Sequence, residues 1–222
     1  MWTGLVLGLN GAGKTLLLRQ LIAQNLKKQK TIMQRIIKFM MSSHDKEDEY
    51  KDFPCLINSN TQPSIGVEHW SLKLKKNKCM LREVGGQLVS MWPVYFESCH
   101  FWFFLIDASN PTQLADAAVE FYSILNVDEM RHKPKLLVIN HIDASSLVND
   151  EVLQTHLCLD RLVIDQDYGP IQIIKVSALT GENVGNIFKW LDHLDHNSSK
   201  GFCEICRTLL RPNIIRVYPV TK

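Results

Sequence analysis

The sequence predicts an α/β protein in which a mostly parallel, doubly wound sheet carries helices on both faces. Three observations support this fold class. Strand-like apolar runs alternate with helix-like amphipathic runs along the chain. Residues 100–107 and 135–140 are almost continuously apolar, which is typical of strands buried on both faces of a parallel sheet. A glycine-rich turn joins the first strand to the first helix.

The first half of the chain is expected to contain one strand, one helix and a hairpin. Leu5 to Leu7 form a short buried strand, and a helix begins at Lys14. A second apolar periodic run, 32–41, either extends that helix or starts another. Residues 67–74 alternate partly and residues 79–84 are mostly apolar, so we expect them to pair as a hairpin.

The second half is expected to repeat the order of strand and helix. A helix begins at Pro111, because proline favours the first turn, and runs to about Asn126. Further helices are predicted at 150–162 and 183–195, and they flank a strand at 171–176. This repetition predicts βαβ units and therefore a parallel sheet.

Length and composition fit one domain with a substantial core. The chain has 222 residues, of which 45% are hydrophobic and 22% charged. We expect residues 1–196 to form the domain, interrupted by an exposed, mobile, charge-rich insertion at about 42–60. Residues 197–222 form an extension of unassigned structure and role.

Charge and cysteine content narrow the function classes. The net charge of +2 gives no strong field that would point to nucleic acid or to an anionic membrane. No nucleic-acid partner is therefore expected, and we expect a monomer. Six cysteines without a regular framework favour a reducing, cytoplasmic setting. Cys203 and Cys206 have C-x-x-C spacing and could be half of a zinc site, but no second pair follows. Trp2 excludes N-myristoylation at this start site, and no stretch reaches the ~20 apolar residues of a membrane span.

A complete phosphate-loop motif, G-x-x-x-x-G-K-T, follows the first strand. Its glycines let backbone N–H groups turn inward around a phosphate, and the next helix adds its positive end. Lys14 would reach the β and γ oxygens, and the Thr15 hydroxyl would bind Mg²⁺. A chance glycine turn is the alternative. The nucleotide-binding residues of this loop are Gly8, Leu9, Asn10, Gly11, Ala12, Gly13, Lys14 and Thr15.

Residues around the hairpin fit the roles of nucleotide-sensing loops. Glu83 ends the second hairpin strand, where a carboxylate would hold the magnesium through water, although Asp is usual there. Gly86 would offer its N–H to the γ-phosphate, and Gln87 would orient the attacking water. Ser64 is the candidate for a second magnesium hydroxyl. A plain strand-end turn and a polar turn residue are the alternatives.

Two segments in the second half could read a purine base. Asp143 of N-H-I-D can accept hydrogen bonds from guanine N1–H and the exocyclic amine, a pattern that adenine lacks. Asn140 would brace the loop, and His141, where lysine is usual, would stack on the base. A backbone N–H of Ser177 or Ala178 would reach the guanine O6. A simple helix-capping aspartate is the alternative for Asp143.

These motifs together resemble the Arf-like branch of the small GTPases. The resemblance rests on G-L-N-G-A-G-K-T at 8–15, P-S-I-G at 63–66 and V-G-G-Q at 84–87, where the family usually has Asp in place of Asn10 and Thr in place of Ser64. It implies a Ras-like P-loop GTPase fold with a six-stranded sheet. It also implies GTP/GDP exchange with Mg²⁺, and GTP-state effectors, an exchange factor and an activating protein. Recruitment by partners to membranes or the ciliary base would follow.

Two other functions remain open from the sequence. A GTP-binding scaffold with negligible hydrolysis would explain why Ser64 and Glu83 depart from the usual magnesium ligands. A P-loop kinase would need a lid with arginines over the phosphates, and Arg19 and Arg35 are not arranged in that way. The leading hypothesis is a regulatory GTPase with a slow intrinsic rate, in which Gln87 positions the water.

Overall fold

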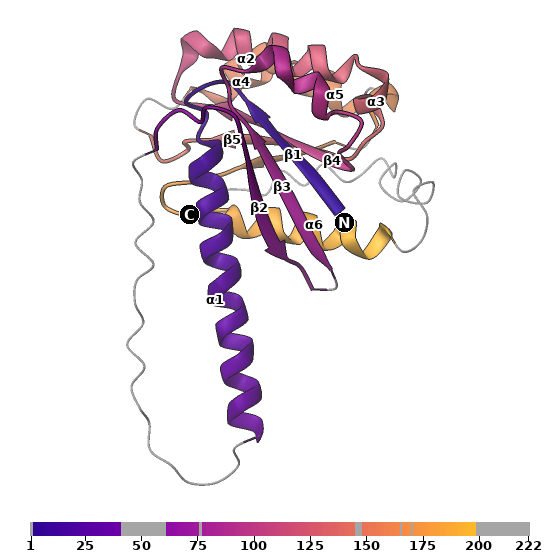
Figure 1. The fold of residues 1–222 in the computed structure, drawn as a ribbon. Coiled ribbons are helices and arrows are strands. Elements are labelled where there is room, and N and C mark those ends of the chain that lie inside the picture. Colours follow the sequence, from indigo (N-terminus) through magenta and orange to yellow (C-terminus); the bar gives the residue numbers. More distant parts are fainter. Residues whose placement is uncertain are drawn as a thin grey trace.

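The computed structural model describes residues 2–40, 61–75, 77–144, 148–164, 166–169 and 171–198. Its centre is a six-stranded sheet with the strand order β2-β3-β1-β4-β5-β6 (Figure 1). The pair β2–β3 is antiparallel, and the other neighbours are parallel. The predicted fold class, hairpin and strand number are therefore confirmed. The strands are β1 (Trp2–Gly8), β2 (Val67–Lys73), β3 (Lys78–Val84), β4 (Phe101–Asp107), β5 (Lys135–Asn140) and β6 (Ile171–Lys175).

Helices cover both faces of the sheet and enclose one apolar core on each (Figure 1). One face carries α1 (Lys14–Met40) and α6 (Val184–Ser198). The other face carries the remaining helices and the 3-10 helix η1. These elements are α2 (Pro111–Leu125), α3 (Asp128–Arg131), α4 (Asp150–Leu157), α5 (Leu159–Ile164) and η1 (Val89–Tyr95).

Strand β4 shows why the sheet needs both layers. Its six residues from Phe101 to Ile106 are at most 1% exposed. Because side chains alternate along a strand, Phe101 and Phe103 face α6, where the Trp190 ring lies 5.7 Å and 5.4 Å from theirs. Trp102 and Phe104 face α2, at 5.7 Å and 5.3 Å from the ring of Phe121. This accounts for the continuous apolar run in the sequence.

Some elements differ from the expectation. The run 32–41 extends α1 as far as Met40. The helix predicted at 150–162 is divided into α4 and α5 at Cys158, whose backbone is left-handed (φ 44°, ψ 43°). Leu157 and Leu162 are both buried in the α2-side core, whereas an unbroken helix would turn them about 140° apart. The sequence pattern did not predict η1, α3 or the short 3-10 helix η2 (Gln166–Tyr168).

Two sequence expectations lie outside the described residues. One is the insertion at 42–60. The other is the C-terminal extension with Cys203 and Cys206, of which only the beginning, up to Ser198 at the end of α6, is described. Both remain expectations.

The long helix α1 is tied to the edge strand β2. The Asn25 side-chain amide donates to Lys73 O at 2.8 Å, and its oxygen accepts from Lys73 N at 3.4 Å. The Lys75 backbone N–H donates to the Asp192 carboxylate of α6 at 3.3 Å. These side chains satisfy backbone groups that an edge strand leaves unpaired. None of the helices in the described part of the chain has the length and apolar character of a membrane span.

Candidate functional site

The phosphate loop lies at the carboxyl end of β1, in the middle of the sheet. From β1 the sheet continues through β3 and β2 on one side and through β4, β5 and β6 on the other. In open α/β sheets, such a point of reversal forms the crevice in which ligands bind. Gly11 and Gly13 have φ values of 83° and 82°, which a side chain would strain. A Cβ at Gly13 would also collide with the Asn140 amide, so the loop needs glycine there.

Lys14 folds back over this loop. Its Nζ donates to the backbone oxygens of Gly8 at 2.9 Å and Leu9 at 3.0 Å, and the residue is only 6% exposed. Burial lowers the pKa of Lys14 to about 8, against the opposing attraction of the Glu83 carboxylate. The ammonium group is therefore held at the mouth of the glycine-rich loop, where a phosphate would compete for it.

The three predicted metal ligands converge below the loop. Thr15 Oγ1 donates to Glu83 Oε1 at 2.6 Å, and Ser64 Oγ lies 3.4 Å from the same oxygen and 3.1 Å from Thr15 Oγ1. Glu83 is 1% exposed, and its Oε2 is buried with no hydrogen-bond partner in the described structure. Burial raises the pKa of Glu83, although the Thr15 bond and the charge of Lys14 oppose this rise.

These residues fit a hard cation such as Mg²⁺. The donor set is two hydroxyls and one carboxylate, and hard cations prefer oxygen ligands. The Glu83 Oε2 is a buried polar atom without a hydrogen-bond partner, which is costly unless a cation or a donor meets it. Sequence reasoning chose these three residues from separate segments, and the fold brings them together.

The double glycine after β3 lies between two other loops. A Cβ on Gly86 would collide with the backbone at Asn10, and one on Gly85 would collide with the Ser64 carbonyl oxygen. Gly85 also donates its N–H to Gly66 O at 3.0 Å. Gln87 follows and is exposed. The glycines thus allow Gly86, the predicted donor to the γ-phosphate, to lie against the phosphate loop.

On the other side of the phosphate loop, Asn140 connects the two predicted base-reading segments. Its Nδ2 donates to Ala12 O at 3.0 Å, and its Oδ1 accepts from Ala178 N at 2.9 Å. Asn140 and Ser177 are fully buried, and Ser177 Oγ accepts from Thr180 N at 3.0 Å. The predicted bracing role of Asn140 therefore has a geometric basis. The Ala178 N–H, assigned to the base from the sequence, points to Asn140 here.

His141 is held by a carboxylate that the sequence reasoning did not assign to the site. His141 has φ 64°, and its Nδ1 lies 2.8 Å from Asp107 Oδ1. The Asp107 hydrogen bond raises the pKa of His141. Although burial alone would raise the pKa of Asp107, hydrogen bonds from His141 and Ser109 lower it. In the sequence, Asp107 ends the predicted strand 100–107 and His141 directly follows the predicted strand 135–140, and the structure pairs Asp107 with Asn140. Asp143 is exposed.

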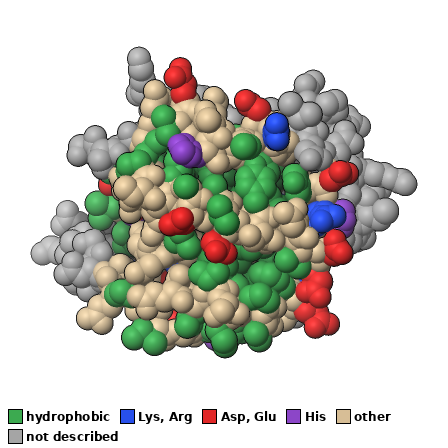
Figure 2. Space-filling view, turned by 90° about the horizontal axis from the view of Figure 1, so that it is seen from above, with side chains coloured by type: hydrophobic (Ala, Val, Ile, Leu, Met, Phe, Trp, Pro, Cys, Tyr) green, Lys and Arg blue, Asp and Glu red, His purple; other side chains and the backbone are tan. Residues whose placement is uncertain are grey.

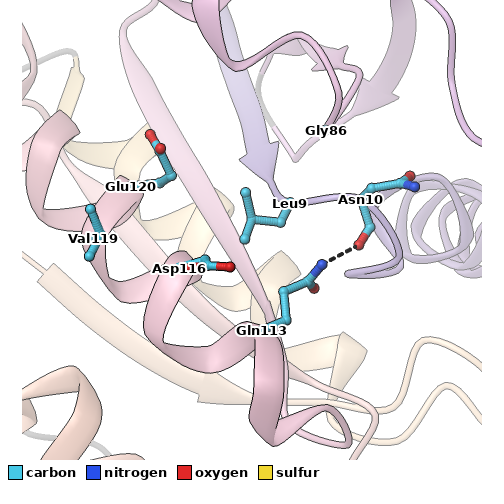
Figure 3. A pocket seen from close by; sticks show the side chains of 7 residues that line it. All are labelled: Leu9, Asn10, Gly86, Gln113, Asp116, Val119 and Glu120. Atoms are coloured by element: carbon cyan, nitrogen blue, oxygen red, sulfur yellow. Dashed lines mark hydrogen bonds between the residues drawn. The ribbon is translucent and has the colours of Figure 1, made fainter.

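A groove of about 440 Å³ lies beside the phosphate loop rather than under the base-reading segments (Figure 3). Gln113 of α2 spans it and donates to Asn10 O at 3.1 Å. The predicted base-reading residues do not line it, so the groove adjoins only the phosphate side of the candidate site. Its lining consists of Leu9, Asn10, Gly86, Gln113, Asp116, Val119 and Glu120.

Comparisons with known proteins agree with this architecture. The model of the ADP-ribosylation factor family matches residues 55–194. Human ADP-ribosylation factor-like protein 16 is 26% identical over 187 residues, which cover 84% of this chain and 83% of that protein. ADP-ribosylation factor-like protein 3 of Saccharomyces cerevisiae is 24% identical, with 84% and 82% covered.

A solved structure shows the same fold. The Arl6 BBS3 small GTPase from Trypanosoma brucei, with a bound nucleotide analogue GppNp, superposes with a TM-score of 0.64 and 17% identity. The match covers 90% of this chain and 99% of that one. The family model begins after the phosphate loop, whereas the structural match spans most of the chain. This chain therefore belongs to the ADP-ribosylation factor family and has the α/β fold of its small GTPases.

Proposed function

We propose that this chain is a guanine-nucleotide switch that cycles between GTP and GDP and hydrolyses GTP slowly. One observation carries the proposal. Thr15, Ser64 and Glu83, which come from three separate segments, meet through distances of 2.6 to 3.4 Å directly below a glycine-rich loop that carries a buried lysine. A structural role alone would not require a buried carboxylate with one unpaired oxygen at that point.

On the phosphate side, the loop amides and Lys14 would bind the β- and γ-phosphates. Thr15 and Ser64 would hold Mg²⁺, and Glu83 would hold it directly or through water. When bound, the ion neutralises phosphate charge as it develops during transfer. Lys14 would then exchange its two carbonyl partners for phosphate oxygens, which accept stronger, charge-assisted hydrogen bonds.

On the base side, Asp143 would accept from guanine N1–H and the exocyclic amine. Its exposure leaves it accessible. Asn140 would keep the base-reading segments against the phosphate loop, and the His141 ring, fixed by Asp107, would cover the purine. The backbone at Ser177 and Ala178 would supply a donor to O6, which requires the Ala178 N–H to be shared with Asn140 or released by it.

For hydrolysis, Gly86 would donate its N–H to the γ-phosphate, and Gln87 would orient the attacking water. We expect an intrinsic rate on the order of 10⁻⁴ to 10⁻² s⁻¹, because such switches rely on a partner to complete the site. The proposal therefore includes an activating protein, an exchange factor and effectors that bind the GTP state. We place the protein in the cytoplasm, recruited to membranes or the ciliary base and acting in membrane or ciliary traffic.

A GTP-binding scaffold with negligible hydrolysis is the second candidate. The observation that favours it is the reach of Glu83, whose carboxylate contacts both candidate magnesium hydroxyls directly. In this arrangement the carboxylate competes for the hydroxyls, so magnesium binding and turnover would both be weaker.

Nucleotide selectivity tests the switch proposal. Affinities for GTP, GDP, ATP and xanthosine triphosphate would be measured with and without Mg²⁺ on the wild type, on Asp143→Asn and on the control Asp160→Asn, which changes an exposed carboxylate on α5. We expect guanine preference in the wild type and in the control. In Asp143→Asn the preference should move toward xanthine, whose 2-oxo group accepts from the new amide. Retained guanine affinity would remove the base assignment, and a strong preference for ATP would favour a kinase.

Turnover separates the switch from the scaffold. Single-turnover hydrolysis would be followed on the wild type and on Gln87→Leu, with and without a large excess of candidate activating proteins. A switch should show accelerated hydrolysis in the wild type and suppressed hydrolysis in Gln87→Leu, with GTP affinity preserved. Hydrolysis that no activating protein accelerates would support the scaffold. Equal turnover in the two chains would remove the role of Gln87.

A further inference from the structure

Helix α1 extends well beyond the domain that it helps to build. It runs from Lys14 to Met40, and Figure 1 shows its C-terminal part projecting past the sheet and α6. Among the described interactions, the hydrogen bonds and ion pairs that tie α1 to the rest of the domain end near Asn25, which bonds Lys73, and Lys28, which lies 3.9 Å from Asp192. The side chains of residues 29–34, the last that the structure describes in α1, make no hydrogen bond or ion pair with the rest of the domain.

The C-terminal half of α1 from Leu26 onward, here called the projecting part, carries exposed apolar side chains. Leu26, Ile32 and Met33 are 51%, 50% and 61% exposed, whereas Leu17 and Leu21 nearer the start of the helix are fully buried. Leu26 lies about half a turn around the helix from Leu17, so it faces away from the sheet. The sequence continues the periodic pattern, with apolar residues at positions 36, 37, 39 and 40.

The same helix carries positive charge alone. Between Lys14 and Met40 there are seven Lys and Arg residues and no Asp or Glu. Lys27, Lys28 and Lys30 are exposed and flank the apolar positions Leu26 and Met33. The opposite layer differs: α2 and α4 contain Asp and Glu but no Lys or Arg. Figure 2 shows the molecule from that side, where acidic side chains are frequent and basic ones sparse.

We propose that the projecting part of α1 binds an anionic lipid surface. An amphipathic helix with a basic polar side lies in the plane of a membrane interface, where its apolar residues enter the headgroup boundary. Leu26, Ile32 and Met33 would insert, and the neighbouring lysines would meet anionic headgroups.

The positive charge of α1 favours an anionic lipid surface over a second copy of the chain as the binding partner of the projecting part. Two α1 helices packed along their apolar sides would bring together only positive residues, because neither helix offers a carboxylate. Like charges along paired helices are destabilising. A surface with negative charge matches both the apolar and the basic residues of the helix.

Binding would also orient the candidate site. Lys14 and Thr15 are the first residues of the same continuous helix. The phosphate loop would therefore be held at a fixed direction relative to the membrane. Vesicle binding by α1 does not require a bound nucleotide, so lipid binding and nucleotide binding can each be absent without the other.

The test is cosedimentation of the full chain with vesicles of phosphatidylcholine, either alone or with phosphatidylserine. We expect binding that requires phosphatidylserine and weakens as salt rises. Ile32→Glu with Met33→Glu should lower the partition coefficient at least tenfold, and so should Lys27→Glu with Lys30→Glu, because each basic residue near an anionic surface contributes roughly fivefold.

Matched control variants place the same changes elsewhere. Val119→Glu alters a residue of α2 that is 63% exposed, and Lys73→Glu with Lys78→Glu changes the charge equally on the exposed β-hairpin. Both controls should bind vesicles within about twofold of the wild type. All variants should keep the far-ultraviolet circular dichroism of the wild type, and the α1 variants should keep its guanine-nucleotide affinity.

Three outcomes would overturn the proposal. The first is a wild type that does not sediment with phosphatidylserine vesicles, and the second is equal sedimentation of the α1 variants and the wild type. The third is a wild-type dimer in analytical ultracentrifugation that Ile32→Glu with Met33→Glu dissociates while vesicle binding is absent, which would assign the helix to a second copy.

Discussion

The two ends of the candidate nucleotide site are built differently. At the phosphate end, Lys14, Thr15 and Glu83 are mostly buried and already bonded to one another or to the loop backbone. At the base end, the bracing Asn140 is buried, but the residue proposed to read the base, Asp143, is exposed.

We therefore expect the phosphate end to determine the affinity for the nucleotide and the base end to determine which purine is preferred. Buried charged groups at the phosphate end cost free energy unless ligand atoms supply their missing partners. Substitutions there should therefore change both the affinity for nucleotide and the stability of the fold. The base end would distinguish purines through a solvent-accessible carboxylate. Substitutions there should therefore alter the preference among bases more than the affinity for the triphosphate. The following variants test this division, beginning with the largest expected effect.

Lys14→Ala should cause the largest loss of affinity for nucleoside triphosphates. Losing one partner of a desolvated charge pair costs about 2–5 kcal/mol, so affinity for GTP and ATP should fall by at least about thirtyfold. Isothermal titration with both nucleotides measures this, with Lys78→Ala on the exposed hairpin as the control. A loss of GTP affinity alone would place Lys14 in base selection and break the comparison.

Asn140→Ala should destabilise the fold as well as weaken binding. The change leaves Ala12 O and Ala178 N, both in buried hydrogen bonds, without this partner. Each unsatisfied buried group costs about 1–3 kcal/mol, so the free energy of unfolding should fall by about 2–5 kcal/mol. Urea denaturation measures it, and exposed Asn126→Ala should change it little. If both variants were equally stable, the bracing role of Asn140 would be wrong.

Glu83→Gln should reduce the advantage that Mg²⁺ gives to GTP binding, by about tenfold, since a neutral amide attracts a divalent cation far less than a carboxylate. The measurement is GTP affinity with Mg²⁺ and with a chelator. Glu83→Asp, which restores the residue usual at this position, should keep the dependence on Mg²⁺. If GTP affinity in Glu83→Gln depended on Mg²⁺ as strongly as in the wild type, the Glu83 carboxylate would have no role in metal binding.

The pH dependence of GTP affinity should follow Lys14. Burial lowers its pKa to about 8 in the free protein, whereas a bound phosphate favours the charged form. Binding above about pH 8 must therefore take up a proton, and affinity should fall by up to about tenfold per pH unit. Titrations between pH 7 and 10 would test this, and a flat profile would show that the free lysine is still charged.

His141→Ala should have the smallest effect. The raised pKa of His141 means that its pair with Asp107 stabilises the fold below the unfolded-state pKa of about 6.5 and loses this contribution as pH rises through the folded-state value. Asp107 has a lowered pKa, so its contribution is lost only in acid. We expect a loss of about 1 kcal/mol or less at pH 6 and a smaller one at pH 9 by urea denaturation. A larger loss at pH 9 would contradict this pairing.

The sequence predicted the fold and the convergence of the phosphate-side residues, because a contiguous sequence motif and the order of the strands carry that information. The G-x-x-x-x-G-K-T motif placed Lys14 and Thr15 together, and the hairpin placed Glu83 opposite them. The Asp107–His141 pair was missed because it joins residues 34 positions apart on adjacent strands. Its detection requires the β4–β5 register. The break at Cys158 was missed because no local sequence signal marks it. It allows Leu157 and Leu162 to be buried in the same core, which depends on tertiary packing.

The two hydrogen bonds between the Asn25 side chain and the Lys73 backbone fix the position of β2 along α1. Along an edge strand, alternate residues point their N–H and C=O outward, so Ser71 and Lys75 share this direction with Lys73. Sliding β2 by two residues would offer Asn25 an equivalent pair of groups, whereas a slide of one would offer none and would also invert the buried face. The Asn25 amide thus allows only registers of β2 that differ by an even number of residues, and so specifies the register between helix and sheet.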